Sequence, residues 1–345
     1  MAENKNRHTV EFLRMLQALP LDVKIAKTQQ RIREWVQYYG VDGVYVSFSG
    51  GKDSTVLLHI ARKLYPNIEA VFVDTGLEDP SVKEFVKTVD NVMTIRPKRN
   101  FRDVIIRFGY PFIGKEQAQS IYYARAGQPS CLQKFDPESK HSTKYGPKFD
   151  LTKYKALLTT NFQLSHMCCY DMKKKPLKAY IRKSKKKPII GTMAEESLLR
   201  ETTWLRQGCN SFEGKKETSK PLSFWTEQDI LAYIKENNLK IASAYGEIIE
   251  QNGKLKCTLC NRTGCIFCGF GAHMENGDNE ILRFIYLKKY HPKLYDYCMR
   301  GGEFNDKGIW QPNKDGLGMA YVIDELNKLY SKTLKDGTVK KFIIY

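Results

Sequence analysis

The stretch VYVSFSGGKDS, Val44–Ser54, decides the fold. Its first half is a short apolar run that predicts a strand over 44–48. Its second half is small and polar and leads into an amphipathic pattern that predicts a helix over 55–64. Small residues let the backbone approach an anion, and the helix N-terminus adds positive potential. The stretch therefore predicts a phosphate-binding turn between a strand and a helix.

This turn differs from the P-loop of nucleoside triphosphatases. That loop requires G-x-x-x-x-G-K-[ST], whereas Val46 occupies the first glycine position here and Asp53 follows Lys52. Lys52 is placed to neutralise phosphate charge. A plain glycine turn is the alternative, but open α/β sheets bind ligands at the carboxyl ends of their strands. A ligand site is the better interpretation.

Strands and helices alternate on both sides of this turn. Further strands are predicted at 70–73, 92–95 and 188–191, and helices at 10–17, 21–39, 80–89, 101–108, 176–183, 226–236 and 319–329. Asp79 with Pro80 and Thr226 with Asp229 are helix-start signals, and Gly109 is a helix stop. The pattern predicts an α/β fold with a doubly wound parallel sheet, N-terminal helices and a Cys-rich C-terminal region.

We expect three parts along the chain. Residues 1–40 form an N-terminal helical segment, 41–240 a nucleotide-binding α/β domain, and 241–345 a Cys-rich and helical region. Periodicity is poor between about 110 and 165, which predicts an insertion or a lid.

Composition favours a cytoplasmic protein that does not span a membrane. The 345 residues contain no apolar run long enough to cross a bilayer and no apolar signal segment at the N-terminus. Nine cysteines in a reducing compartment suit metal binding or catalysis better than disulfides. The net charge of +18 favours nucleic acid or nucleotides as partners, with a lysine-rich solvated surface as the alternative.

Six of the cysteines are grouped. Cys168 and Cys169 are adjacent, and Cys257, Cys260, Cys265 and Cys268 follow the spacing C-x2-C-x4-C-x2-C. Two C-x2-C pairs are typical of a zinc site, and cysteine thiolates also hold iron–sulfur clusters. Adjacent cysteines are hard to explain as core residues of one strand, because neighbouring side chains face opposite ways.

Several segments resemble a known family. Ser49–Ser54, SGGKDS, resembles the PP-loop of the adenine nucleotide α-hydrolase-like superfamily. Four more segments are similar to the phosphoadenosine phosphosulfate (PAPS) reductase family, in its cluster-containing branch: VFVDTG at 71–76, the cysteine pair with KPL at 175–177, GTMAEES at 191–197 with Arg200, and PLSFWTEQDI at 221–230. With Cys265 and Cys268, the resemblance runs from about Val44 to Cys268.

The resemblance implies an adenine nucleotide site. ATP, or PAPS or adenylyl sulfate (APS), would lie on the loop. Asp74 follows a predicted strand next to the loop, where a carboxylate is placed to hold Mg²⁺ or a ribose hydroxyl. The implied nucleotide-binding residues are Ser49, Gly50, Gly51, Lys52, Asp53, Ser54, Asp74, Thr75, Gly191, Glu196 and Arg200. For Asp74 a strand-capping carboxylate is the alternative, and for Glu196 a carboxylate on a helix face.

The resemblance also implies a 4Fe-4S cluster on Cys168, Cys169, Cys265 and Cys268. Cys257 and Cys260 then stand outside the family pattern as a spare dithiol. The alternative ligand set is Cys257, Cys260, Cys265 and Cys268, holding either a cluster or Zn²⁺. A third alternative leaves the thiols without metal.

One departure shapes the functional hypotheses. APS and PAPS reductases carry a catalytic cysteine in an ECGLH-type tail, and this sequence has no cysteine after Cys298. Our first hypothesis is therefore ATP cleavage and adenylylation coupled to sulfur transfer, with a nucleic acid as candidate acceptor and a sulfur- or electron-donor protein as candidate partner.

The second hypothesis is a thiol-dependent APS/PAPS reductase that produces sulfite and uses Cys257 or Cys260 as its nucleophile. The third is a nucleic-acid-binding module with a zinc knuckle. The candidate catalytic residues are Lys52, Asp53, Asp74, Cys257 and Cys260.

Overall fold

The computed structural model describes residues 6–139, 150–213, 217–275 and 281–345. The chain forms two compact units, each assembled from separated segments. Unit 1 comprises residues 1–74, 78–96 and 176–263, and unit 2 comprises 75–77, 97–175 and 264–345. The three-part division expected from the sequence stays a prediction.

A six-stranded sheet forms the centre of unit 1. Its order is β3-β2-β1-β5-β7-β6, and only the pairing of β6 with β7 is antiparallel. The strands are β1 (Val44–Ser47), β2 (Ala70–Val73), β3 (Val92–Ile95), β5 (Lys187–Ile190), β6 (Asn210–Ser211) and β7 (Thr218–Ser219). The predicted α/β fold with a mainly parallel sheet is confirmed.

The chain reverses its direction across the sheet at β1. It moves from β1 outward to β2 and β3, and later returns to β5 on the other side of β1. Val46 thus pairs with Ala70 of β2 and with Ile189 of β5. Such a switch point is where open α/β sheets bind ligands, beyond the carboxyl ends of the strands. The predicted phosphate turn follows β1 directly.

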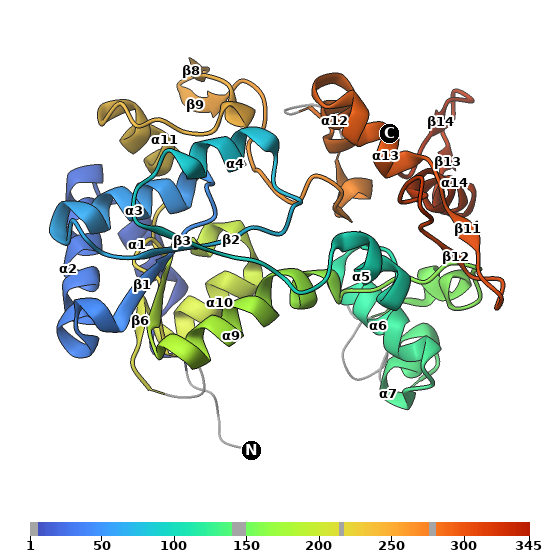
Figure 1. Ribbon diagram of the computed structural model, residues 1–345, viewed down its shortest axis with the longest axis horizontal. Coiled ribbons are helices and arrows are strands. Elements are labelled where there is room, and N and C mark those ends of the chain that lie inside the picture. Colours follow the sequence, from blue (N-terminus) through green and yellow to red (C-terminus); the bar gives the residue numbers. More distant parts are fainter. Residues whose placement is uncertain (1–5, 140–149, 214–216, 276–280) are drawn as a thin grey trace. The chain divides into compact units, whose positions relative to one another are not determined.

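Helices cover both faces of this sheet (Figure 1). The helices α3 and α4 lie toward one face, and α9 and α10 toward the other. The helices of unit 1 are α1 (Val10–Gln17), α2 (Leu21–Tyr39), α3 (Lys52–Leu64), α4 (Pro80–Lys87), α9 (Lys175–Ser184, whose first residue belongs to unit 2), α10 (Leu198–Gln207) and α11 (Glu227–Glu236). A hairpin of β8 (Ile248–Gln251) and β9 (Lys254–Cys257) completes the unit.

The predicted helix starts have the expected chemistry. The Asp79 carboxylate accepts a hydrogen bond from Ser81 N at the start of α4. Thr226 and Asp229 form the capping box of α11. The Asp229 carboxylate also accepts a bond of 2.7 Å from Lys24 Nζ of α2, whose side chain is buried. This contact ties the N-terminal helices to α11.

Unit 2 is mainly helical around its own core. Its helices are α5 (Phe101–Phe108), α6 (Lys115–Arg125), α7 (Pro129–Leu132), α12 (Arg283–Tyr290), α13 (Pro292–Met299) and α14 (Met319–Tyr330). The short strands β4 (Phe112–Ile113) and β10 (Gly269–Phe270) pair in parallel. Two small hairpins join β11 (Glu303–Phe304) to β12 (Trp310–Gln311) and β13 (Lys332–Thr333) to β14 (Val339–Lys340).

The region around 110–165 is more regular than its sequence suggested. It contains β4, α6, α7 and two 3-10 segments at Gln133–Phe135 and Thr152–Leu158, while 140–149 lie outside the described residues. Ala118, Ile121 and Ala124 of α6 are buried in the unit 2 core. The helix α6 was not predicted because its buried face is formed mostly by small side chains, which give a weak apolar periodicity in the sequence.

Among the residues that the structure describes, no helix is both long enough and apolar enough to cross a bilayer.

Candidate functional site

Two serines close the phosphate turn that follows β1. Ser54 Oγ accepts a hydrogen bond of 3.1 Å from Ser49 N and donates one of 2.9 Å to the carbonyl of Gly51. The two serine hydroxyls are 3.0 Å apart, and Ser49 Oγ accepts from Gly51 N at 3.3 Å. The predicted residues Ser49, Gly50, Gly51 and Ser54 therefore form one tight turn at the N-terminus of α3.

Two glycines allow close packing at this turn. Gly50 has φ +72°, and a Cβ there would lie 2.7 Å from a methyl group of Val82 and of Val86 on α4. A Cβ at Gly191, directly after β5, would lie 3.2 Å from the carbonyl oxygen of Asp53. The ends of β1 and β5 thus meet at the first turn of α3, as the switch-point geometry predicts.

Lys52 is held inside unit 1. Its side chain is 2% exposed, and Nζ donates to the carbonyl of Asn261 at 2.7 Å. The Glu227 carboxylate lies 3.2 Å from Nζ and the Asp53 carboxylate 3.7 Å. Burial disfavours the charged form, but Asp53, Tyr245 and Glu227 outweigh it, so that the pKa of Lys52 is raised. Lys52 therefore carries its charge within a set of protein partners.

A second segment, 257–263, lies against the phosphate turn. The Tyr245 hydroxyl accepts a hydrogen bond of 3.1 Å from Lys52 N and is 2.7 Å from Thr263 Oγ1. Together with the Lys52–Asn261 bond, these contacts fix residues 261–263 beside the first turn of α3. The segment that carries the spare cysteines therefore adjoins the phosphate turn. We call the phosphate turn and the residues that contact it, including 257–263, the loop site.

Cys257 and Cys260 both belong to this segment of unit 1. Cys257 ends β9 and is buried in a cluster with Val82, Leu231 and Tyr245. Burial raises the pKa of its thiol, while the nearby Lys52 acts in the opposite direction. Cys260 is half-buried, and its backbone N–H donates to the carbonyl of Ala244 at 3.2 Å.

Charged side chains gather after β5. Arg200 forms an ion pair with Glu196, and Arg262 lies 3.9 Å from the same carboxylate. Glu196 also accepts from Met193 N at 2.8 Å, so it caps the short 3-10 turn Ala194–Glu196. Both arginines act electrostatically on Asp53, whose pKa is raised by burial. The predicted residues Asp53, Glu196 and Arg200 thus lie together, and Glu196 has a structural role.

Asp74 directly follows β2 and lies between two cations. Lys83 Nζ lies 3.1 Å from one of its oxygens, and Arg96 Nε donates to the other at 3.0 Å. A role in binding Mg²⁺ stays a prediction, as does that of Thr75. Thr75 belongs to unit 2, where its hydroxyl accepts from Leu77 N at 3.2 Å.

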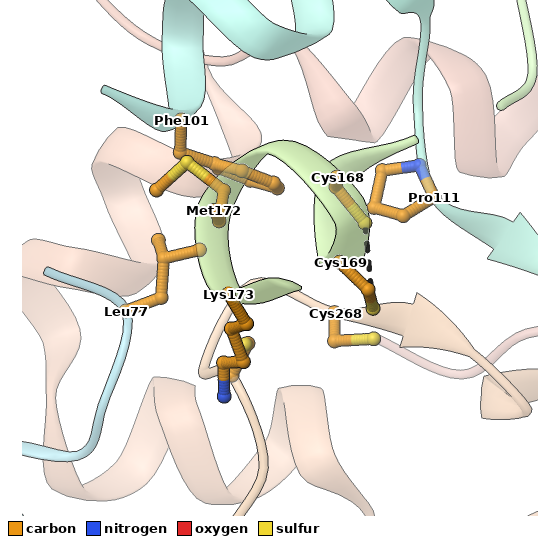
Figure 2. Close-up of a pocket in the computed structure, with 9 residues that line it drawn as sticks. Leu77, Phe101, Pro111, Cys168, Cys169, Met172, Lys173 and Cys268 are labelled. Atoms are coloured by element: carbon orange, nitrogen blue, oxygen red, sulfur yellow. Dashed lines mark hydrogen bonds between the residues drawn. The ribbon is translucent and has the colours of Figure 1, made fainter. Parts of the chain in front are cut away.

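Four cysteines line one cavity inside unit 2 (Figure 2). They are Cys168, Cys169, Cys265 and Cys268, and the other lining residues are Leu77, Phe101, Pro111, Met172 and Lys173. The adjacent pair precedes the π-helical turn Tyr170–Lys174, which continues into α9. The Cys168 thiol donates toward Cys169 Sγ across 3.9 Å, and Cys268 faces the same space.

The cavity favours one thiolate. The hydrogen bond from Cys168, supported by Lys115 and Lys173, lowers the pKa of Cys169 to about 5. The same hydrogen bond and burial raise the pKa of Cys168, and burial raises that of Cys268. Arg283 donates to the carbonyl of Cys268 at 2.7 Å and so adds a further cation near this turn.

The two candidate ligand sets differ in where they lie. The first set, with Cys168 and Cys169, lies wholly in unit 2, whereas Cys257 and Cys260 of the alternative set belong to unit 1. Within the described parts of the chain, no three His, Cys, Asp or Glu side chains already stand in metal-binding geometry. The ligand set stays a prediction.

Several residues of the loop site escaped sequence analysis. They are Glu227, Tyr245, Asn261, Arg262 and Thr263, and around the cysteines Lys115 and Arg283. Glu227 stood in the segment singled out at 221–230, and Asn261, Arg262 and Thr263 stood between the cysteines of the 257–268 stretch, without a role being expected for them. The position of the others depends on contacts between distant parts of the chain.

A family model named phosphoadenosine phosphosulfate reductase domain matches residues 43–117 and 132–268, more than half of the chain. The matched residues include the phosphate turn, Asp74, Arg200 and the four cysteines of the cavity. The chain belongs to the PAPS reductase domain family. Membership in this family implies an adenine nucleotide as ligand.

Individual relatives of this PAPS reductase family member are distant. An adenosine 5′-phosphosulfate reductase of Staphylococcus haemolyticus is 25% identical over 67% of the chain and 77% of its own length. One of Oceanobacillus iheyensis is 26% identical over 66% and 76%. An uncharacterized protein of Methanocaldococcus jannaschii is 23% identical over 78% of the chain, which spans about half, 51%, of that longer protein.

A solved PAPS reductase structure from Candida auris, a phosphate complex, aligns with 72% of the chain and 99% of its own. The TM-score is 0.36 and the sequence identity 14%.

Proposed function

We propose that this protein is a thiol-dependent APS or PAPS reductase that releases sulfite. The observation that carries the proposal is the extent of the match to adenosine 5′-phosphosulfate reductases. It covers 67% of this chain and 77% of one relative, a larger share than a shared nucleotide turn alone needs. This support reverses the order of our two enzymatic hypotheses.

The cysteine cavity of unit 2 fits an iron–sulfur cluster. Four thiol groups border one cavity, and its other walls are apolar except for Lys173. Soft thiolate ligands suit iron–sulfur clusters or zinc. We propose that Cys168, Cys169, Cys265 and Cys268 hold a 4Fe-4S cluster, which would supply redox-active iron to unit 2.

The loop site of unit 1 supports the nucleotide-binding part of the proposal. The phosphate turn offers its backbone and the N-terminus of α3 to an anion. Arg200 and Arg262 supply cations after β5, and both are more than one third exposed, with 42% and 62% of their side chains accessible. These arginines, rather than the enclosed Lys52, are the groups available to a phosphate or sulfate oxygen.

Cys260 is the proposed nucleophile. It is half-buried on the segment that lies against the phosphate turn, whereas Cys257 is buried with a raised pKa. The Cys260 thiolate attacks the sulfur of the sulfate group and the S–O bond to the nucleotide breaks. AMP leaves when the substrate is APS, and adenosine 3′,5′-bisphosphate leaves when it is PAPS. The Cys257 thiol then attacks Cys260 Sγ, releases sulfite and leaves a Cys257–Cys260 disulfide, which an external dithiol reduces.

The assay for this reaction uses protein purified without oxygen. APS or PAPS is supplied with a dithiol, and sulfite and the released nucleotide are measured. We expect sulfite and nucleotide in equal amounts, and a loss of at least about 100-fold for Cys260→Ser, because the attacking thiolate is removed. Cys209→Ser, a thiol in unit 1 outside the loop site, is the matched control and should keep its activity. Absence of sulfite with both substrates refutes the proposal.

A second candidate is ATP-dependent sulfur transfer. The observation in its favour is the net charge of +18, which suits a nucleic acid as sulfur acceptor. In this reaction ATP adenylylates an oxygen of the acceptor and releases pyrophosphate. The terminal sulfur of a donor protein's persulfide then attacks the activated carbon and AMP leaves, and an external thiol reduces the remaining S–S bond to free the donor. Pyrophosphate and AMP formed from ATP, with no sulfite from APS or PAPS, would support this candidate.

Metal analysis tests the proposed ligands independently of activity. We expect a brown protein with about four irons per chain. The colour should be lost in Cys168→Ala and Cys169→Ala and kept in Cys257→Ala and Cys260→Ala. A colourless protein with one zinc would contradict the cluster, and loss of iron in all four variants would contradict the ligand set.

A further inference from the structure

The solvent face of helix α9 is basic in its unit 1 part. Between Lys178 and Lys185, the exposed positions are Lys178, Ala179, Arg182, Lys183 and Lys185. Four of these five carry a positive charge, and we call Lys178, Arg182, Lys183 and Lys185 the basic strip. Lys178 and Arg182 follow the spacing i, i+4, which places them on one face of α9, and Lys185 directly follows the helix end at Ser184. Acidic residues are absent from the sequence between Asp171 and Glu195.

The opposite face of α9 is already in use. Leu177, Tyr180 and Ile181 are partly buried. The Tyr180 ring packs edge-on against Tyr45 of β1, with 5.2 Å between centroids, and its hydroxyl donates to Glu69. The apolar side of the helix therefore packs on the sheet, and the basic strip is what α9 presents to solvent.

Stability of the helix does not explain the strip. Cations stabilise a helix in its last turn, where Arg182 and Lys183 lie, but Lys178 is about two turns from the end. The next two lysines form ion pairs within unit 1. Lys186 is paired with Glu69 at 2.7 Å, and Lys187 is paired with Glu217. Lys186 and Lys187 thus contact carboxylates of unit 1 at the start of β5. The residues of the basic strip are exposed to solvent.

We propose that the basic strip of α9 binds the phosphodiester backbone of a nucleic acid. From Lys178 to its end at Ser184 the helix rises about 9 Å, at roughly 1.5 Å per residue. A nucleic-acid strand places a charge about every 3.4 Å along the axis of a duplex, so about three phosphates match this length. Contacts of this kind carry no sequence information and position the nucleic acid on the protein.

A membrane surface fits the strip less well. A helix that lies on a membrane inserts an apolar face between the lipid head groups. The apolar face of α9 packs within unit 1, and Ala179 is the one uncharged exposed position between Lys178 and Lys185. The inference does not depend on the proposed reductase activity, since it rests on a surface outside the loop site and the cysteine cavity.

The test is the salt dependence of binding. Fluorescence anisotropy of the full chain is measured with a fluorescein-labelled single-stranded DNA, the same sequence as RNA, and the duplex, in potassium chloride from about 50 to 200 mM. In the variant Arg182→Gln/Lys183→Gln/Lys185→Gln, we expect duplex affinity at low salt to fall at least about ten-fold. The slope of log K against log salt should become shallower by about 2.7, since each phosphate contact contributes about 0.9.

A matched control removes three cations elsewhere in unit 1. Lys235→Gln/Lys240→Gln/Lys254→Gln changes the net charge equally at exposed positions on and near α11, and Lys235, like Arg182, lies in a last helical turn. We expect this control to keep the wild-type slope. Equal losses in both variants, or no loss in the α9 variant, overturn the proposal, and so does binding only to phosphatidylserine vesicles.

A measurement on the unaltered protein completes the test. Amide hydrogen exchange is followed with and without the tightest-binding oligonucleotide. Slower exchange at 177–186 in the complex supports the basic strip as the contact, and protection confined to other segments overturns it. The DNA, RNA and duplex arms show which form of the phosphodiester chain binds best.

Discussion

At the scale of single residues, the phosphate turn depends on one glycine that no other residue can replace. Gly50 has φ +72°, and its missing Cβ leaves room for Val82 and Val86 of α4. Gly50 therefore satisfies two separate requirements: its backbone is left-handed, and it leaves space for the buried side chains of Val82 and Val86. The turn keeps its shape because both are satisfied.

Gly50→Ala should be destabilising for both reasons. The left-handed backbone costs about 1 kcal/mol for a side chain, and the two contacts of 2.7 Å force α4 or the turn to move. Overpacking of this kind costs about 1–3 kcal/mol more. Thermal unfolding followed by circular dichroism measures the loss. Gly253→Ala is the control, because Gly253 has φ +69° with nothing within 4 Å of its Cβ position. Equal losses in the two variants would contradict the packing argument.

Asp53 is a partly buried carboxylate whose ionisation works against folding. Burial raises the pKa of its carboxyl, and its Oδ1 atom has no hydrogen-bond partner. A raised pKa means that the folded state holds the proton more tightly than the unfolded state, so ionisation at neutral pH opposes folding. Asp53→Asn should therefore be more stable than the wild type at pH 7, by about 1 kcal/mol, or roughly 2 °C in melting temperature.

The pH dependence tests this reasoning. The advantage of Asp53→Asn should shrink as the pH falls through the titration range of the carboxyl, because the wild-type side chain becomes neutral as well. Melting temperatures between about pH 4 and pH 8 provide the comparison. Asp22→Asn, at an exposed position, controls for general charge effects. A difference that stays constant with pH would contradict a buried ionised Asp53.

At the scale of secondary-structure elements, Tyr245 joins three parts of the loop site. Its hydroxyl accepts from Lys52 N at the start of α3 and is bonded to Thr263 on the segment of the spare cysteines. The side chain itself is buried beside Cys257. One hydroxyl thus holds the 257–263 segment against the phosphate turn.

Tyr245→Phe should loosen that segment. The substitution leaves Lys52 N and Thr263 Oγ1 without this partner, at a cost of about 1–3 kcal/mol in unfolding free energy. We also expect alkylation of Cys260 to become faster, since residues 261–263 lose one of their two ties to α3. Mass spectrometry after brief iodoacetamide treatment measures this rate. Tyr38→Phe, whose side chain is 66% exposed, is the control and should change neither quantity. Unchanged alkylation in Tyr245→Phe would show that the Lys52–Asn261 bond alone holds the segment.

Sequence reasoning succeeded where the signal is local. The helices at 10–17, 21–39 and 101–108 and the strands at 70–73 and 92–95 have the predicted bounds, because each has a clear apolar period and a local start or stop residue. It failed for α6, whose buried face includes Ala118, Ser120 and Ala124, and for β6 and β7, which are two residues long. Such elements are set by their neighbours rather than by their own pattern.

The loop site shows the same division. The phosphate turn is contiguous in sequence and was predictable. The enclosure of Lys52 was not, because Glu227, Tyr245 and Asn261 follow it by 175 or more residues along the chain. The ion pairs of Asp74 with Lys83 and Arg96 likewise depend on the parallel register of β2 and β3.

At the scale of the whole molecule, the proposed chemistry is divided between the two units. Unit 1 contains the phosphate turn with Cys257 and Cys260, and unit 2 contains the four-cysteine cavity. The chain passes between the units between Thr263 and Gly264, inside the twelve-residue cysteine stretch. The two C-x2-C pairs that look like one zinc site in sequence therefore belong to different compact units.

This division predicts which unit loses local stability when the metal is removed. The proposed cluster ties Cys168 and Cys169 to Cys265 and Cys268, two segments nearly one hundred residues apart, and closing a loop of this size stabilises the fold that contains it. Removing the metal should therefore accelerate amide exchange in unit 2, by about ten-fold or more, at Ile266, which donates to Leu77 O, and at Gly271, which donates to Ile113 O. The amide of Val46, which donates to Glu69 O beside the sheet of unit 1, is the internal control and should exchange as before.

Hydrogen exchange with mass spectrometry, on holoprotein and on protein treated with a chelator under reducing conditions, makes the comparison. Equal acceleration in both units would mean that the metal supports the whole chain, and no acceleration at Ile266 or Gly271 would mean that the four cysteines do not hold it.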